Sequence, residues 1–184
     1  MRFLEPPQDT SLAAKEARAI GSEILGRCVG GRTRLIARVI TAHYDEALRP
    51  SGLRAGQLTM LAIAGTVDRV RPAELQELLA MDKSTVSRNV KVVVDHGWLE
   101  RLDDEAGRGY GLRLTSAGRE RLKLALPIWR KAQEEAAELL MPPIFAALKL
   151  VGDSLLAKSE YHIDIGEFQP TMPTPEAMAA LASL

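Results

Sequence analysis

Apolar residues recur with two different periods in the middle of this chain, and each period predicts a different element. Between residues 83 and 96 they follow helical spacing, at Val86, Val90, Val93 and Val94. Over residues 98–102 and again over 110–115, apolar and polar residues alternate, and glycines lie in the connection between the two segments. The sequence therefore predicts a helix that is followed directly by a β-hairpin.

A shorter amphipathic helix and a tight turn are predicted just before this helix. Pro72 opens the shorter helix, at a position where its missing N–H costs nothing. Asp82 is the predicted N-cap of the second helix, because its carboxylate can accept hydrogen bonds from the first-turn N–H groups. Gly97 is predicted to end that helix in the left-handed conformation. Together these elements form a helix-turn-helix with a two-stranded wing.

The outer face of the second helix carries short hydroxyl and basic side chains, and no acidic residue lies between Asp82 and Asp95. Short hydroxyls can approach phosphates and base edges, and an arginine one turn later can bind guanine through two hydrogen bonds. An arginine at the hairpin tip can reach an adjacent minor groove. These features predict that the protein binds duplex DNA through Ser84, Thr85, Ser87, Arg88, Lys91 and Arg108. The alternative is that these side chains belong to an ordinary solvated helix face and loop.

The remaining chain is predicted to be mostly helical. Thr10 or Ser11 caps a helix that runs to Arg27, Gly30-Gly31 breaks it, and a further helix reaches about Leu48. Later helices are expected over residues 55–65, from a cap at Thr115 to about 140, and from 144 to about 158. The expected organisation is an arm and dimerisation helices at 1–50, a winged helix-turn-helix domain at 51–120, C-terminal dimerisation helices at 121–160, and a tail at 161–184.

The helices after the wing carry more apolar surface than one small winged domain can cover. This surplus predicts a homodimer, although the same helices could instead fold back on their own subunit. In a two-fold symmetric dimer, the two recognition helices read half-sites about 10 base pairs apart. We therefore expect the operator to be an inverted repeat.

Several motifs make the chain resemble the MarR (multiple-antibiotic-resistance regulator) family of winged-helix transcription factors. The resemblance covers roughly residues 30–140 and rests on the segments 52–61, 75–79, 81–88, 95–99 and 114–118. It implies a homodimeric repressor or activator whose N- and C-terminal helices intertwine, and of the two we expect a repressor. The wing departs from the family pattern, since Ala106 and Gly107 replace an acidic residue and an arginine that members commonly carry.

The resemblance also implies that a small molecule or oxidation changes the affinity for DNA. The matching ligand region lies between residues 28–47 and 55–65, where Arg32, Arg38 and His43 are candidates for binding a small aromatic or anionic effector. The favoured alternative is that these arginines are solvated or pair with the partner's acidic C-terminal helices. Cys28 is a candidate for redox sensing, because nearby arginines favour the thiolate, although a lone cysteine on an apolar helix face usually serves packing.

Composition limits the other possibilities. The formal net charge is zero, but residues 83–123 hold nine Lys and Arg against six Asp and Glu. With one cysteine, neither an internal disulfide nor a cysteine zinc cluster can form within one chain, and we expect no metal and no cofactor. No catalytic motif is present, and no membrane span or signal peptide is expected, so we predict a cytoplasmic protein that is not an enzyme. A winged-helix module that binds proteins instead of DNA remains an alternative.

Overall fold

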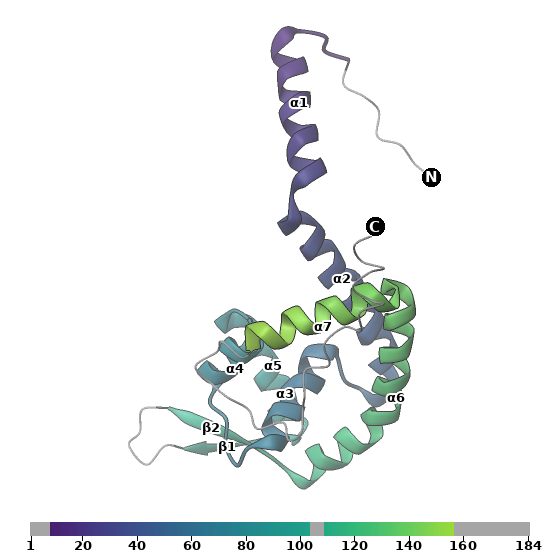
Figure 1. Ribbon diagram of the computed structural model, residues 1–184. Coiled ribbons are helices and arrows are strands. Elements are labelled where there is room, and N and C mark those ends of the chain that lie inside the picture. The colour runs from purple at the N-terminus through teal and green to yellow at the C-terminus, as the bar shows by residue number, and fades with distance from the viewer. Residues whose placement is uncertain (1–7, 104–108, 157–184) are drawn as a thin grey trace. The chain divides into compact units, whose positions relative to one another are not determined.

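The computed structural model describes residues 8–103 and 109–156, which divide into two compact units at residues 1–40 and 41–184. Figure 1 shows the helices and the hairpin along the chain. The elements are α1 (Leu12–Arg27), α2 (Val29–Leu48), the 3-10 helix η1 (Arg49–Ser51), α3 (Ala55–Thr66), α4 (Pro72–Leu78), α5 (Lys83–Asp95), β1 (Leu99–Asp103), β2 (Tyr110–Leu114), α6 (Ser116–Leu140) and α7 (Pro142–Leu156). Over the described residues the fold is mainly helical with an antiparallel hairpin, as predicted.

The N-terminal unit consists of α1 and the first part of α2. The hydroxyl of Ser11 accepts a hydrogen bond from the N–H of Ala14, so Ser11 is the N-cap of α1. The predicted break at Gly30-Gly31 is wrong, because the helices separate at Cys28, whose backbone is extended. Both glycines lie in the first turn of α2. The thiol sulfur of Cys28 accepts a hydrogen bond from the N–H of Gly31 at 3.3 Å, which caps that turn.

The core of the second unit joins helices α3 to α6 to the hairpin. The largest fully buried side chains come from every one of these elements except α6, from the end of α2 and from the segment that leads into α3: Leu48, Leu53, Met60, Leu61, Leu75, Val86, Val90, Val93, Leu99 and Leu112. Ala125 of α6 packs against the same cluster. Because α5 and β1 share this core, the helix and the hairpin are held as one body.

The wing is a two-stranded antiparallel sheet in which Leu99 pairs with Leu114 and Asp103 with Tyr110. Val70 adds a single bridging residue on the other side of β2, exchanging two backbone hydrogen bonds of 3.0 and 2.8 Å with Leu112. The segment between α3 and α4 is therefore attached directly to the wing. This attachment places the start of the helix-turn-helix beside the hairpin.

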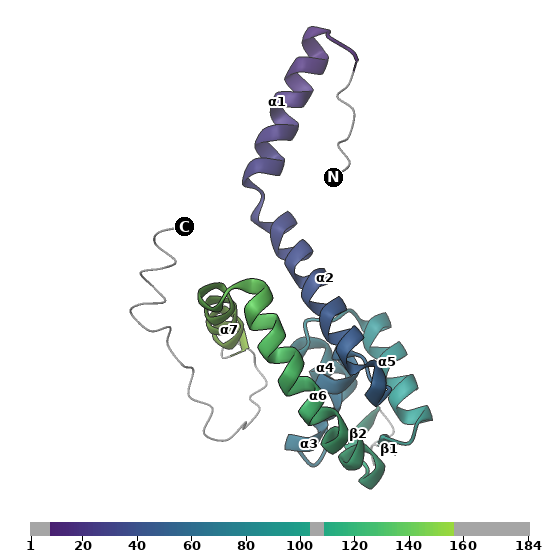
Figure 2. The same ribbon diagram turned by 90° about the vertical axis from the view of Figure 1, so that its right-hand side faces the viewer.

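Two helices follow the wing. The hydroxyl of Thr115 accepts a hydrogen bond from the N–H of Gly118 at 3.0 Å and caps α6, as predicted. The last helix starts at Pro142 and not at residue 144, because prolines fit the first turn of a helix. Figure 2 shows α6 and α7 in a second view. Among the residues that the structure describes, no single helix is long and apolar enough to cross a membrane.

Candidate nucleic-acid interface

Helix α5 has one buried face and one exposed face. Val86, Val90 and Val93 are at most 1% exposed and face the core, against which Leu75 of α4 also packs. The side chains predicted to contact DNA lie elsewhere on the helix: Ser84, Ser87, Arg88 and Lys91 are exposed, and Thr85 is half-buried. The helix thus presents its polar face to solvent while the core fixes its orientation.

The N-terminus of α5 is organised by the carboxylate of Asp82. Its Oδ1 atom accepts hydrogen bonds from the Thr85 N–H at 2.9 Å and from the Ser84 hydroxyl at 2.5 Å. Its Oδ2 atom accepts a hydrogen bond from the Thr85 hydroxyl at 2.7 Å. The hydrogen bonds from the hydroxyls of Ser84 and Thr85 hold the pKa of Asp82 well below its usual range. Asp82 is therefore both the predicted N-cap and an anionic acceptor for two predicted DNA-binding side chains.

Arg88 is connected to the same group of side chains. Its Nη2 atom donates a hydrogen bond to Oγ1 of Thr85 at 3.1 Å. Hydrogen bonds thereby link the N-cap Asp82 to Thr85 and Thr85 to Arg88, at successive intervals of three residues. Arg88 is exposed, but its guanidinium is held by the hydrogen bond to Thr85.

Lys91 is paired on its own helix. Its ammonium group forms an ion pair with the carboxylate of Asp95 one turn later, and both side chains are largely exposed. Exposed pairs of this kind contribute little to stability and are easily exchanged. Lys91 remains available to phosphates, with Asp95 as a competing anion.

The strands of the wing carry two further basic residues with partners. The guanidinium of Arg101 lies 4.5 Å from the centre of the Tyr110 ring, and Nε of Arg113 lies 2.9 Å from Oε1 of Glu100. Arg108, predicted at the tip of the wing, lies outside the described residues.

A stack of three side chains at the end of α5 was not predicted from the sequence. The His96 ring lies on the Trp98 indole with centroids 4.5 Å apart, and the guanidinium of Arg121 lies 4.9 Å from the indole centre. Arg121 also donates a hydrogen bond to the main-chain oxygen of Ser51 at 2.8 Å. The stack connects α5, the wing and α6 to η1.

The four candidate effector or redox residues lie in different surroundings. Cys28 and Arg32 are close together, since Arg32 donates hydrogen bonds to the main-chain oxygens of Cys28 and Gly26. Arg38 is exposed on α2. His43 is half-buried against α6, with its Nε2 atom 3.0 Å from the main-chain oxygen of Ala132 and 3.7 Å from the carboxylate of Glu135.

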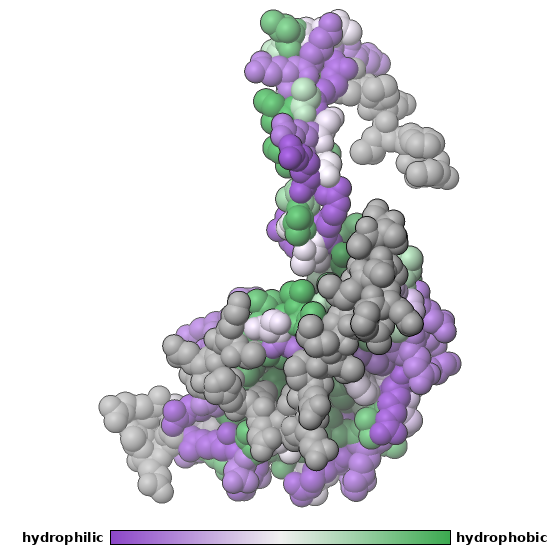
Figure 3. Space-filling model, in the orientation of Figure 1, coloured by the Kyte–Doolittle hydropathy of each residue, from purple (hydrophilic) through white to green (hydrophobic). Residues whose placement is uncertain are grey.

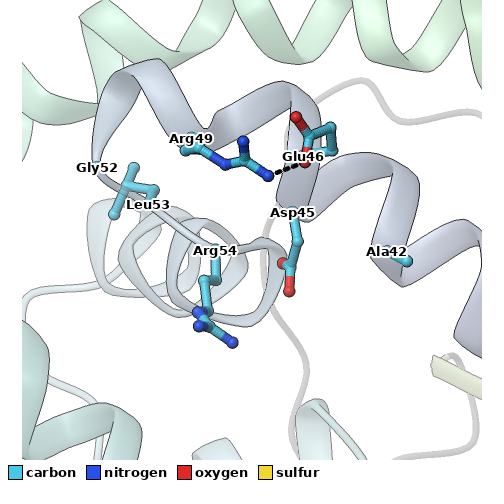
Figure 4. A pocket seen from close by; sticks show the side chains of 7 residues that line it. All are labelled: Ala42, Asp45, Glu46, Arg49, Gly52, Leu53 and Arg54. Carbon is cyan, nitrogen blue, oxygen red and sulfur yellow. Dashed lines mark hydrogen bonds and ion pairs between the residues drawn. The ribbon is translucent and has the colours of Figure 1, made fainter.

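A polar pocket of about 410 Å³ lies where α2, η1 and α3 meet (Figure 4). Glu46 and Arg49 form an ion pair there, and the carboxylate of Asp45 accepts a hydrogen bond from the Ala55 N–H at 2.8 Å. The Asp45 contact holds the start of α3 to the end of α2, and the Glu46–Arg49 pair joins the end of α2 to η1, so we assign the charged groups a structural role.

An apolar pocket of about 510 Å³ lies between α3 and α6. Its walls are mostly aliphatic and aromatic, and Lys123 supplies one cationic group at its edge. The residues that line it are Leu58, Thr59, Ala62, Leu122, Lys123, Leu126 and Trp129. Its α3 wall falls within the region that the sequence predicted for an effector, whereas its other wall is α6.

Sequence reasoning identified the residues of the α5 face but not their mutual contacts. The spacing of Asp82, Thr85 and Arg88 at intervals of three residues could have indicated a connected row, because residues three apart on a helix are neighbours. No comparable signal exists for Arg121 and Ser51, which are 70 residues apart in the chain.

Comparisons with known proteins agree with this geometry. The MarR family model matches residues 51–109. A curated relative, the uncharacterized HTH-type transcriptional regulator YwoH of Bacillus subtilis (strain 168), is 31% identical over 72 residues, which make up 39% of this chain and 53% of that protein. The chain thus matches about half the length of this curated relative.

Similar solved structures extend beyond the winged segment. The transcriptional regulator MosR of M. tuberculosis, solved in complex with DNA, is 29% identical, with a TM-score of 0.60 over 71% of this chain and 98% of that chain. Wild-type MarR from E. coli is 22% identical, with a TM-score of 0.57 over 70% of this chain and 96% of that chain. The latter similarity concerns the fold alone.

Proposed function

The chain belongs to the MarR family of winged-helix transcriptional regulators, and on this premise we propose that it binds operator DNA through α5 and the wing. The observation that carries the proposal is the two-sided α5. Val86, Val90 and Val93 are buried in the core that also holds β1, and Ser84, Ser87, Arg88 and Lys91 are exposed. A helix held in this way can enter the major groove without rearrangement.

Different residues of this surface have different proposed roles. Arg88 reads a base edge, because its guanidinium can donate two hydrogen bonds to guanine. Ser87 and Lys91 contact the phosphate backbone, which positions the helix but contributes little to sequence preference. Arg108 is proposed to contact the adjacent minor groove. The complex of MosR with DNA supports duplex DNA as the ligand class.

A homodimer is part of the proposal. Large apolar side chains remain exposed along α1 and α2 (Figure 3), among them Ile24 at 58%, Val29 at 74% and Leu35 at 63%. On α6 and α7, Leu139, Val151 and Leu155 are 55%, 55% and 64% exposed. Exposed apolar surface of this extent is typical of protein interfaces, so these helices are assigned to the contact with a second copy.

The test of this proposal is selection of binding sites from a library of random duplexes by the purified full-length protein. We expect enrichment of an inverted repeat with half-sites about 10 base pairs apart, as two symmetric recognition helices require. Enrichment of a single half-site would contradict the dimer. Recovery of no preferred sequence would contradict operator binding and favour a winged-helix module that binds proteins.

Repression with release by a small molecule is the proposed mode of regulation. The apolar pocket between α3 and α6 has the size and lining of small-molecule sites, and α3 packs on the wing and on α5. A ligand with apolar rings and an anionic group would fit the walls and compete with the Glu120 carboxylate, which pairs with Lys123 at 2.7 Å. Occupation of this pocket would shift α3 and with it the recognition helix.

Anilinonaphthalene sulfonate, which combines apolar rings with an anion, is a suitable probe. We expect it to weaken operator binding by the wild-type protein but not by an Ala62→Phe variant, whose larger side chain fills the pocket. Equal weakening in both proteins would place the effector elsewhere, and Arg38 and His43 would then be the next candidates.

Release by oxidation is a second candidate, favoured by the position of Cys28. Its sulfur caps the first turn of α2 through the Gly31 N–H, so oxidation of the thiol by peroxide would change the cap. Serine can cap a helix in the same way. Loss of the peroxide response in a Cys28→Ser variant would support this candidate, and an unchanged response would exclude it.

A further inference from the structure

We propose that Thr85 acts as a positioning residue, which orients Arg88 for base reading while Asp82 fixes the direction of the Thr85 hydroxyl. This inference rests on the proposed function, because it concerns how the DNA-reading arginine is prepared. It revises the prediction that Thr85 contacts DNA directly.

The geometry links the three side chains in one direction. The Thr85 hydroxyl donates a hydrogen bond to Oδ2 of Asp82 at 2.7 Å. Its oxygen, Oγ1, accepts a hydrogen bond from Nη2 of Arg88 at 3.1 Å. The Thr85 backbone N–H is held separately by Oδ1 of Asp82. The hydroxyl is thus fixed at both ends, and its oxygen points a lone pair toward the guanidinium.

The number of hydrogens determines what Thr85 can do. A hydroxyl has one hydrogen to donate, and here that hydrogen is given to Asp82. Phosphate oxygens only accept hydrogen bonds, so Thr85 cannot bind a phosphate through its hydroxyl without first leaving Asp82. The Ser84 hydroxyl is committed to the same carboxylate. Both hydroxyls therefore serve the protein in this arrangement, and neither is free for the DNA backbone.

The effect on Arg88 is to restrict an otherwise mobile side chain. Arginine loses substantial rotamer freedom when it is fixed against a base, and a contact made in advance reduces that loss. One guanidinium N–H is used by Thr85, while the remaining donors stay exposed for the pair of acceptors on guanine. Preorganisation of this kind raises the affinity for the correct base more than the affinity for random sequence.

The test compares Thr85→Val and Thr85→Ser in the full-length protein. Valine keeps the shape and the β-branch but removes the hydroxyl, whereas serine keeps the hydroxyl. The probes are a fluorescent duplex that carries the sequence selected by the wild-type protein and a scrambled duplex of the same composition. Anisotropy gives the ratio of the dissociation constant for scrambled DNA to that for the selected sequence, which measures specificity.

We expect Thr85→Val to reduce this ratio about three- to tenfold, with the dissociation constant for scrambled DNA unchanged, and Thr85→Ser to retain the ratio. In an Arg88→Ala background, Thr85→Val should have no further effect, because the residue that it orients is absent. An equal loss of affinity for both duplexes would show a direct phosphate contact and overturn the inference. An unchanged ratio in Thr85→Val would overturn it as well.

A measurement without DNA separates this inference from the proposed function. Nitrogen relaxation of the Arg88 Nε–H group in the free protein should report a more mobile side chain in Thr85→Val than in wild type and Thr85→Ser. Equal mobility in all three proteins would refute the positioning role even if operator binding is sequence-specific. A wild-type protein that does not distinguish the two duplexes would refute the proposed function, and with it this role in base reading.

Discussion

The guanidinium carbon of Arg121 lies 4.9 Å from the centre of the Trp98 ring, and Nη1 of the same arginine donates a hydrogen bond to the Ser51 main-chain oxygen at 2.8 Å. Trp98 is 6% exposed and leads into the wing, while Ser51 belongs to the segment between α2 and α3. The Arg121 side chain of α6 therefore joins Trp98, at the start of the wing, to η1.

We expect Arg121→Ala to lower the free energy of unfolding by about 1–3 kcal/mol, since it removes a cation–π contact and a charged hydrogen bond. Arg121→Lys should lie between this variant and wild type, because lysine keeps the charge but lacks the planar group. Urea unfolding followed by tryptophan fluorescence measures both. Arg130→Ala, on the exposed side of α6, is the control and should change stability by less than about 0.5 kcal/mol.

Gly118, in the first turn of α6, lies against Trp98 and Leu114 at the base of the wing. A Cβ atom at this position would lie 2.2 Å from the main-chain oxygen of Trp98 and 2.6 Å from Cδ1 of Leu114. Gly118→Ala should therefore destabilise the protein by about 1–3 kcal/mol or more, because the backbone must move. At Gly152 in α7 a Cβ meets no atom within 4 Å, so Gly152→Ala should stabilise by about 0.5–1 kcal/mol. Equal effects of the two substitutions in urea unfolding would contradict this packing.

Ala80, in the turn between α4 and α5, has a φ of 49°. This left-handed conformation costs an L-residue about 1–2 kcal/mol, and glycine adopts it freely at a smaller entropic cost. Ala80→Gly should raise the free energy of unfolding by about 0.5–1 kcal/mol. Ala137→Gly, inside α6, should lower it by about 0.5–1 kcal/mol. A loss of stability in Ala80→Gly would mean that the turn is not strained.

The ion pair of Lys91 with Asp95 predicts a change in the salt dependence of DNA binding. Asp95→Asn removes a negative charge next to the phosphates and releases Lys91. The affinity for all sequences should rise, and the slope of log affinity against log salt should steepen by up to about 1. Lys91→Ala should make that slope shallower by about 1. Lys131→Ala, on α6, is the matched control, because Lys131 forms an exposed ion pair with Glu135 four residues later, and a comparable change there would contradict the assignment of Lys91.

Local signals in the sequence predicted the elements that carry the site. Ser11, Asp82 and Thr115 each cap the helix that their side chains were expected to cap. The spacing of the valines also identified the buried face of α5, because the same period that forms a helix decides which side meets the core.

Contacts between distant or single residues could not be predicted in this way. Val70 adds only one residue to the sheet, which is too short for an alternating pattern to be visible. The helix break was predicted at Gly30-Gly31 and lies at Cys28. Glycine is costly inside a helix but tolerable in its first turn, where the N–H groups lack helical partners. The direction of the hydrogen bonds among Asp82, Thr85 and Arg88 depends on side-chain rotamers, which the sequence pattern does not specify.

The role of α5 is tested by binding to the selected operator and to scrambled DNA over a salt series, for wild type and for Arg88→Ala. We expect wild type to prefer the operator strongly, and Arg88→Ala to lose about 1–3 kcal/mol of this preference while its binding to scrambled DNA stays nearly unchanged. Equal preference in the two proteins would contradict the assignment of α5 as the helix that reads the DNA sequence.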